Sequence, residues 1–542
     1  MKRLRPSLAP VVAPLLALTL SACGASSPSA TEDGTRDSFS TPERIPADAP
    51  NTAPSGPTDE PSSPTGATGS TGAAGPVLAP SDNGLVSGPA SPELVASARQ
   101  IQERLACMRG KPFKQDPAVE FQSLADFRKY VQGQLDKEFE GPKGARLVRV
   151  LHALDIVDPS VDVMSQMLEA AVGQAAAYYD PETDTFYVVQ QMPALMLNSV
   201  MAHELQHALQ DQHTDLLGDY LDQGFGNIDK DLAARFVVEG EATLLGHAWL
   251  VADMQARLPG GSESSICHLP GKTAGDPQTF WPIMREIVAG AAQQTRDDVL
   301  NPSMLEKVAS AGMGSNDAMA KSMEQLRQLP VYFFYTLLLP YNQGGLTIYE
   351  TFEKSGYGWK EIDALFESPP ESTEQVLHPE KLLAKEGFKS VGVPTKAPIS
   401  AEAAAAWTSD PPERLGELTI RILMVEEGLS EAEAVEAAAG WNGDQLRVWV
   451  KDDLLAFDWK IEWDSAKDRG EFMAKMPALL AKQRPGVEGV DAAAVANPIG
   501  SMTLRWKDPQ GRDRFGALKW TPTAVRWTDG WDLAPTLADD AG

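Results

Sequence analysis

The pattern of apolar and polar positions first takes on a helical period just after Ser91. Apolar residues recur three and four positions apart over 92–109, 119–138 and 145–171, which predicts three amphipathic helices. The period then shortens to two over 177–189, where aromatic and β-branched residues flank an Asp-Pro-Glu-Thr-Asp turn. That stretch predicts a β-hairpin, whose exposed edge would suit an extended peptide.

Two longer helices are predicted after the hairpin. Residues 198–212 contain no glycine or proline, and residues 229–254 begin with acidic side chains, as the helix dipole favours. The strongly apolar stretch 329–339 predicts a buried helix that ends in a turn at Pro340.

The tail of the chain mixes both periods after a Pro/Ala-rich spacer at 394–412. It predicts a turn at 441–444, helices over 415–428, 430–439 and 468–483, and strands over 447–450, 456–463, 503–506 and 515–525. Eight of the twelve tryptophans lie in this tail, at positions 441, 449, 459, 463, 506, 520, 527 and 531. Such a group either forms a binding face or the core of an antiparallel sheet, and we favour the core.

Composition bounds the class of protein. The chain has 542 residues, of which 43% are hydrophobic, so it can bury a large core in more than one domain. Its formal net charge of −28 argues against a nucleic-acid partner, because phosphate binding needs basic patches.

The N-terminus has the pattern of an export signal. Three basic residues precede an apolar run over 8–20, which ends in Leu20-Ser21-Ala22-Cys23-Gly24. This ending resembles the lipobox of bacterial lipoproteins, and the resemblance implies that Cys23 is acylated and anchors the exported chain to a membrane of the cell envelope. The alternative is an ordinary signal peptide cut near Ala22. Residues 24–90 are too poor in large apolar side chains to fold, which predicts a flexible tether. Export also makes Cys107 and Cys267 candidates for a disulfide.

Candidate chemistry lies in the helix predicted over 198–212. His203-Glu204-Leu205-Gln206-His207 reads H-E-x-x-H, and on a helix the two histidines stack on one face. Neutral imidazoles at this spacing can both bind one Zn²⁺, while Glu204 serves as general base for a water molecule.

Two histidines leave the site incomplete, because a catalytic zinc usually has three protein ligands. The second long helix contains Val238-Glu239-Gly240-Glu241-Ala242, and the pair of motifs resembles the gluzincin branch of zinc metallopeptidases. The resemblance implies that His203, His207 and Glu239 bind zinc and that Gly240 lets the two helices approach. Glu241 is the alternative ligand, although it points about 200° around the helix from Glu239.

His213 is a second alternative, because metzincins carry a third histidine at that spacing. Their turn-forming glycine is replaced here by Gln210, which favours continued helix. His378 and Tyr341 are candidate electrophiles that would steady the oxyanion, with a loop histidine that caps the backbone as the alternative for His378. Residues 177–381 also resemble a group of largely uncharacterised bacterial zincin-like proteins.

The sequence therefore predicts an α+β protein with a signal peptide (1–22), a tether (23–90), a mainly helical zincin-like domain (91–393) and a tryptophan-rich α+β region (413–535). The predicted function is a lipid-anchored, zinc-dependent metallopeptidase that cleaves envelope or extracellular proteins. Its partners would be a peptide or protein substrate and, through Cys23, a membrane. The alternative is a non-catalytic envelope lipoprotein that retains the zincin fold and binds a protein or glycan.

Overall fold

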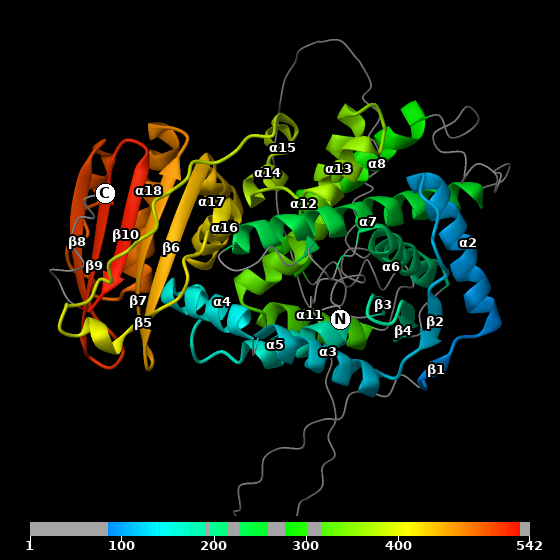
Figure 1. The fold of residues 1–542 in the computed structure, drawn as a ribbon, viewed down its shortest axis with the longest axis horizontal. Coiled ribbons are helices and arrows are strands. Elements are labelled where there is room, and N and C mark those ends of the chain that lie inside the picture. The colour runs from blue at the N-terminus through cyan, green and yellow to red at the C-terminus, as the bar shows by residue number, and fades with distance from the viewer. Residues whose placement is uncertain are drawn as a thin grey trace, which may run out of the picture. The chain divides into compact units, whose positions relative to one another are not determined.

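The computed structural model describes residues 85–139, 141–174, 176–190, 194–214, 216, 220–221, 227–257, 277–301 and 316–531. The predictions for the signal peptide, Cys23, most of the tether and Cys267 lie outside these residues. The described part of the chain has an α+β fold, with mostly helices in its first part and an antiparallel sheet near its C-terminus (Figure 1). The predicted fold class is confirmed at this level.

The first helix, α2 (Pro92–Arg109), spans the range predicted for it. Ser91 accepts a hydrogen bond from the N–H of Leu94 and so caps its N-terminus. The next predicted helix starts too early, because residues Ala118–Phe121 form strand β2 and α3 covers Leu124–Phe139. β2 pairs with strand β1 (Gly88–Pro89), inside the predicted tether, and with a strand more than sixty residues further along the chain. Local periodicity does not reveal such distant pairing.

The helix predicted over 145–171 is two helices, α4 (Pro142–Ala153) and α5 (Val163–Gln174). Between them Asp155 has a positive φ of 54°, and Asp158 accepts a hydrogen bond from the N–H of Ser160 across Pro159. A residue that precedes proline is disfavoured in the helical conformation, which explains why the chain breaks there.

The predicted hairpin is confirmed as strands β3 (Ala177–Asp180) and β4 (Thr185–Val188). With β1 and β2 they form a four-stranded sheet in the order β1-β2-β4-β3, in which β2 and β4 run parallel. β3 lies at the edge of this sheet.

The two helices with the candidate motifs are α6 (Ala194–Thr214) and α7 (Ile228–Ala256). α7 packs against both α6 and α12 (Val331–Lys354), as Figure 1 shows. Most of its side chains are therefore buried. The predicted stop at Pro340 is wrong, because α12 continues through this proline. Proline in a helix costs about 3 kcal/mol, which the burial of α12 on both sides of Pro340 offsets. The other helices that the structure describes in this part are α8 (Pro277–Ala292), α9 (Arg296–Val299), α11 (Asn316–Gln328), α13 (Lys360–Glu367), α14 (Thr373–Leu377) and α15 (Pro379–Ala384).

The C-terminal region contains a six-stranded antiparallel sheet in the order β5-β6-β7-β10-β9-β8. Its strands are β5 (Thr408–Ser409), β6 (Trp441–Lys451), β7 (Leu454–Trp463), β8 (Gly500–Lys507), β9 (Asp513–Trp520) and β10 (Ala524–Gly530). Its helical elements are η3 (Ala404–Ala406), α16 (Gly416–Glu426), α17 (Glu431–Ala438), α18 (Ala466–Gln483) and η4 (Ala494–Ala496). Two predictions are corrected: residues 441–444 form an irregularity at the start of β6 rather than a turn, and 515–525 spans the turn between two strands.

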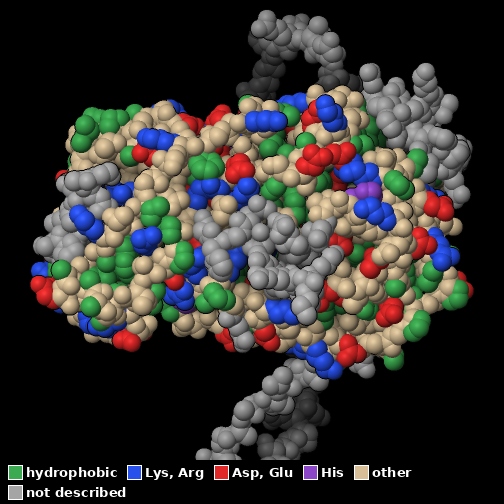
Figure 2. Space-filling view, viewed as in Figure 1, with side chains coloured by type: hydrophobic (Ala, Val, Ile, Leu, Met, Phe, Trp, Pro, Cys, Tyr) green, Lys and Arg blue, Asp and Glu red, His purple; other side chains and the backbone are tan. Residues whose placement is uncertain are grey.

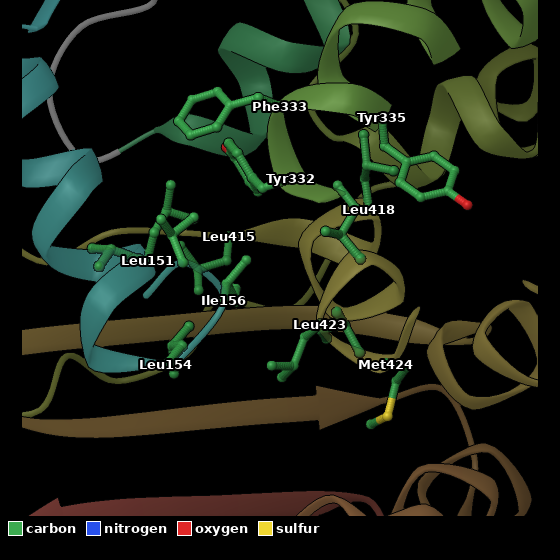
Figure 3. Packing of buried hydrophobic residues seen from close by; sticks show 14 of the residues in the cluster. Leu151, Leu154, Ile156, Tyr332, Phe333, Tyr335, Leu415, Leu418, Leu423 and Met424 are labelled. Carbon is green, nitrogen blue, oxygen red and sulfur yellow. The ribbon is translucent and has the colours of Figure 1, made fainter. Parts of the chain in front are cut away.

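Seven of the eight tryptophans of this region are buried, and Trp531 is partly buried against the cluster that contains Trp449, which confirms that they form a core rather than a binding face. The core continues into the helical part, where Leu151 of α4, Leu154 directly after α4 and Tyr332 of α12 belong to the same buried cluster as Leu418 of α16 (Figure 3). Ion pairs reinforce this contact, including Arg149 with Asp410 at 2.7 Å and the buried pair of Arg146 and Glu413.

The surface carries both signs of charge. On the face drawn in Figure 2, basic and acidic side chains are interspersed, so the net negative charge does not gather there in one patch. Among the described residues, no helix is both long enough and apolar enough to span a membrane.

Candidate metal centre

The candidate ligands of the H-E-x-x-H motif lie on α6, one helical turn apart. The Nε2 atoms of His203 and His207 are 3.1 Å from each other. The carboxylate oxygen Oε2 of Glu239, from α7, is 3.4 Å from the first and 3.3 Å from the second. The structure thus brings together the three residues that the resemblance implied as ligands.

The spacing of these three atoms fits a zinc ion. Two ligands of a tetrahedral zinc, each about 2.0–2.1 Å from the ion, are about 3.3 Å apart. The three residues are buried, each at most 6% exposed, and both oxygens of Glu239 lack a hydrogen bond of good geometry. Two imidazole nitrogens and a carboxylate are also a donor set that zinc prefers. The residues present therefore fit this ion.

The mutual pKa shifts reflect how close these groups lie. Burial alone would raise the pKa of Glu239, but the neighbouring imidazoles lower it to about 2. Burial alone would lower the pKa of His207, but the charge of Glu239 raises it to about 9. Burial lowers the pKa of His203. The ionised carboxylate of Glu239 thus stabilises a positive charge next to it and the two imidazoles.

Glu204 lies beside this group and is fully buried. Its Oε2 accepts a hydrogen bond of 2.9 Å from the N–H of Tyr179 in β3, while its Oε1 has no hydrogen-bond partner. Burial raises the pKa of Glu204 to about 8. The bond to Tyr179 also shows that the edge of β3 faces α6, so a peptide could add to the strand there only by displacing Glu204.

Tyr341 of α12 lies against His203. The two rings stack with their centroids 5.4 Å apart and their planes at 16°. Burial, together with the charges of Glu239 and Glu204, raises the pKa of Tyr341 well above its usual value. Its phenol therefore keeps its proton and can donate a hydrogen bond beside the centre.

Comparison with known proteins finds a matching family model only in the C-terminal region. A model described as a domain of unknown function (DUF8575) matches residues 405–532. Neither a curated protein nor a solved structure matches the chain. The match excludes α6 and α7, so no comparison links the candidate metal centre to a zinc peptidase family.

The structure does not bring Glu241 to the imidazole pair. Its Oε1 accepts from Arg109 at 2.5 Å, and its Oε2 accepts from Gln206 at 3.0 Å and from Gln210 at 2.8 Å. Glu241 is two residues after Glu239 and so faces another side of α7. It acts here as a buried partner of polar side chains rather than as a candidate ligand.

His213 and His378 are also held elsewhere. α6 continues past Gln210, and His213 in its last turn is 2.9 Å from the backbone oxygen of Pro112. His378 follows α14, with its Nε2 2.9 Å from Glu417 of α16. Burial would lower the pKa of His378, but the bond to Glu417 raises it. These contacts correspond to structural roles for both histidines.

The close contact of Gly240 is with α12, whereas the resemblance implied α6. A Cβ atom on it would lie 2.4 Å from the backbone of Gly344, so it permits the approach of α12 rather than of α6. Gly246, two turns later, faces His203 instead. Gln210 is a partner of His207 that the motif alone does not indicate, although the spacing of three residues on one helix places the two on the same face.

Proposed function

We propose that the protein is a zinc-dependent peptidase in which His203, His207 and Glu239 hold the ion. The observation that carries the proposal is the triangle formed by two Nε2 atoms and one carboxylate oxygen, with sides of 3.1–3.4 Å. Glu204 supports a catalytic role over a purely structural one, because a structural zinc has no need of a second carboxylate with a free oxygen beside it.

Zinc bound at this site would polarise a substrate carbonyl and make water more acidic. Glu204 is placed to handle the proton. Its Oε2 is fixed by the N–H of Tyr179, whereas its Oε1 is left to accept a proton from the attacking water and to pass it to the leaving amine. Tyr341, stacked on His203, would donate its phenolic proton in a hydrogen bond to the oxyanion.

The proposed proton transfers imply a substrate class. Attack by water on a polarised carbonyl, with proton delivery to nitrogen, is the hydrolysis of an amide. We propose peptide bonds of envelope or extracellular proteins as the target, since the lipobox-like sequence at Cys23 indicates export and anchoring. Detergent-phase partitioning of the wild type and of a Cys23→Ala variant tests the anchor, and equal partitioning of the two chains would contradict it.

The burial of the centre favours a second candidate. His203, Glu204, His207 and Glu239 are each at most 6% exposed, as is typical of a metal that only stabilises a fold. In that case the protein is a non-catalytic envelope lipoprotein that binds a partner.

One experiment separates the two candidates. We expect the purified full chain to contain about one zinc per molecule and to cleave casein until a chelator is added. Glu204→Gln should keep the metal and lose hydrolysis, whereas His203→Ala should lose the metal. A zinc-containing wild type without activity on any protein substrate would favour the second candidate. A Glu204→Gln variant that cleaves at the wild-type rate would refute the mechanism.

A further inference from the structure

The candidate ligand His207 is tied to a buried polar chain that no part of the proposed reaction uses. Its Nδ1 is 2.9 Å from Oε1 of Gln210, one turn later on α6. Gln210 is in turn bonded to Glu241 of α7, and Glu241 to Arg109 of α2. All four side chains are at most 4% exposed.

The partners of Gln210 fix the orientation of its amide group. One end of the amide is 2.8 Å from a carboxylate oxygen of Glu241 and 2.9 Å from the backbone oxygen of Val238. Both of these atoms only accept hydrogen bonds, so this end must be the –NH₂ group. The other end, which faces His207, is then the amide oxygen.

This orientation determines which nitrogen of His207 carries the proton. An amide oxygen only accepts, so Nδ1 of His207 must be the donor. In a neutral imidazole the other nitrogen, Nε2, then has a lone pair. Nε2 is the atom that faces His203 and Glu239, and a metal ligand needs that lone pair.

Glu241 is held in place as an acceptor from three sides. Arg109 donates to its Oε1, and Gln206 and Gln210 donate to its Oε2. Arg109 also lies 4.7 Å above the ring of Trp359, which anchors α2 near α13. A carboxylate that is paired with Arg109 has only acceptor atoms, so Gln210 must turn its –NH₂ group toward it.

We infer that Gln210 is a positioning residue that holds His207 in the tautomer able to bind the metal, and that Glu241, backed by Arg109, sets the direction of that hydrogen bond. The inference rests on the proposed zinc site and extends it to residues that do not touch the ion. Partners of this kind change metal affinity by about 10- to 100-fold.

Glu241→Gln tests whether Glu241 sets the direction of the hydrogen bond between Gln210 and His207. The new amide has the same shape but can offer an N–H group to Gln210. Only the backbone oxygen of Val238 then still holds the –NH₂ group of Gln210, so the orientation that presents the amide oxygen to His207 is weakened. We expect zinc affinity, measured by competition with a chelator, to fall at least about tenfold. Gln210→Ala removes the bond altogether and should lower the affinity to a similar degree.

Asp363→Asn is the matched control. Asp363 accepts from Arg109 at 2.6 Å, so this variant weakens an ion pair of the same arginine but leaves Glu241 and Gln210 in place. We expect a lower melting temperature with unchanged zinc affinity. If these hydrogen-bonded side chains had only a structural role, all three variants would instead have lower melting temperatures and wild-type zinc affinity.

The outcomes separate this inference from the proposed function. A wild-type chain that binds no zinc overturns both. A wild type that binds zinc, together with Gln210→Ala and Glu241→Gln variants that bind it equally tightly, overturns only the role of Gln210. If Glu241→Gln does not fold, the comparison of Gln210→Ala with Asp363→Asn decides.

Discussion

Gly240 of α7 and Gly344 of α12 meet backbone to backbone: a Cβ atom on Gly240 would lie 2.4 Å from the carbonyl group of Gly344. The contact directly follows Glu239 in the sequence, and Tyr341 lies one turn before Gly344 on α12. The crossing of these two helices therefore determines the positions of both the candidate third ligand and the phenol that stacks on His203. The candidate metal centre depends on a position where only glycine fits.

Gly240→Ala is expected to destabilise the protein by about 2 kcal/mol or more, because an added methyl group forces two packed helices apart. Gly290→Ala in α8 is the control, since nothing lies within 4 Å of a Cβ atom at that position. In α8 alanine should be neutral or stabilise by up to about 1 kcal/mol through its helix propensity. Chemical denaturation measures the free energy of unfolding of both variants. Equal values would contradict the close contact between Gly240 and Gly344.

Tyr341→Phe is expected to keep zinc and the stack on His203 but to lower kcat by about a hundredfold, as the loss of one oxyanion donor does. Tyr335→Phe on the same helix is the control, because its hydroxyl group bonds to Glu431 of α17. Steady-state kinetics on a peptide substrate and zinc analysis provide the measurement. Unchanged kcat in Tyr341→Phe would remove the phenol from the mechanism.

His213→Gln is expected to leave both zinc content and hydrolysis at the wild-type level. The imidazole bonds to the backbone oxygen of Pro112 and lies in the last turn of α6, away from the candidate ligands. Metal analysis of the purified variant is sufficient. Loss of zinc would restore the metzincin-like ligand set considered from the sequence.

The stability of the C-terminal region is expected to fall as pH rises from about 4 to 6. Burial raises the pKa of Asp444 to about 6, even though the N–H groups of Gly416 and Leu415 and the indole of Trp459 bond to it. Between the pKa of the unfolded state, about 3.9, and that of the folded state, the folded chain binds more protons. The free energy of unfolding therefore decreases with pH, by up to about 3 kcal/mol from this residue.

Denaturant titrations at pH 4, 5, 6 and 7 measure this effect. Asp444→Asn should be less stable at every pH, because its amide group presents N–H to atoms that already donate, but it should lack this part of the slope. A variant whose slope matches that of the wild type would assign the pH dependence to other carboxylates.

A chain that ends at residue 404 is expected to lose cooperative unfolding. The shared core would expose Leu151, Leu154 and Tyr332, which belong to the same buried cluster as Leu418 in the full chain. Arg146 would also lose its buried partner Glu413. Circular dichroism during heating measures this. A sharp transition near the wild-type temperature would show that the helical part folds alone.

The sequence by itself determined the features that are local. The spacing of His203 and His207 places two imidazoles on one face of any helix, and the alternation over 177–189 produced the hairpin as predicted. The continuation of α6 past Gln210 was also readable, because glutamine lacks the freedom that a turn would need. The resemblance of the two motifs pointed to Glu239 rather than Glu241 before any packing was known.

Tertiary structure decided whatever depends on distant partners. β2 became a strand because β1 and β4 supply its hydrogen bonds, and α12 passed through Pro340 because burial on both sides outweighs a local cost. The partners of His213, His378 and Glu241 come from segments 31 or more residues away along the chain. A side chain's direction on its own helix follows from the helical period, but the group that it meets depends on how helices pack, and that is set by the whole core.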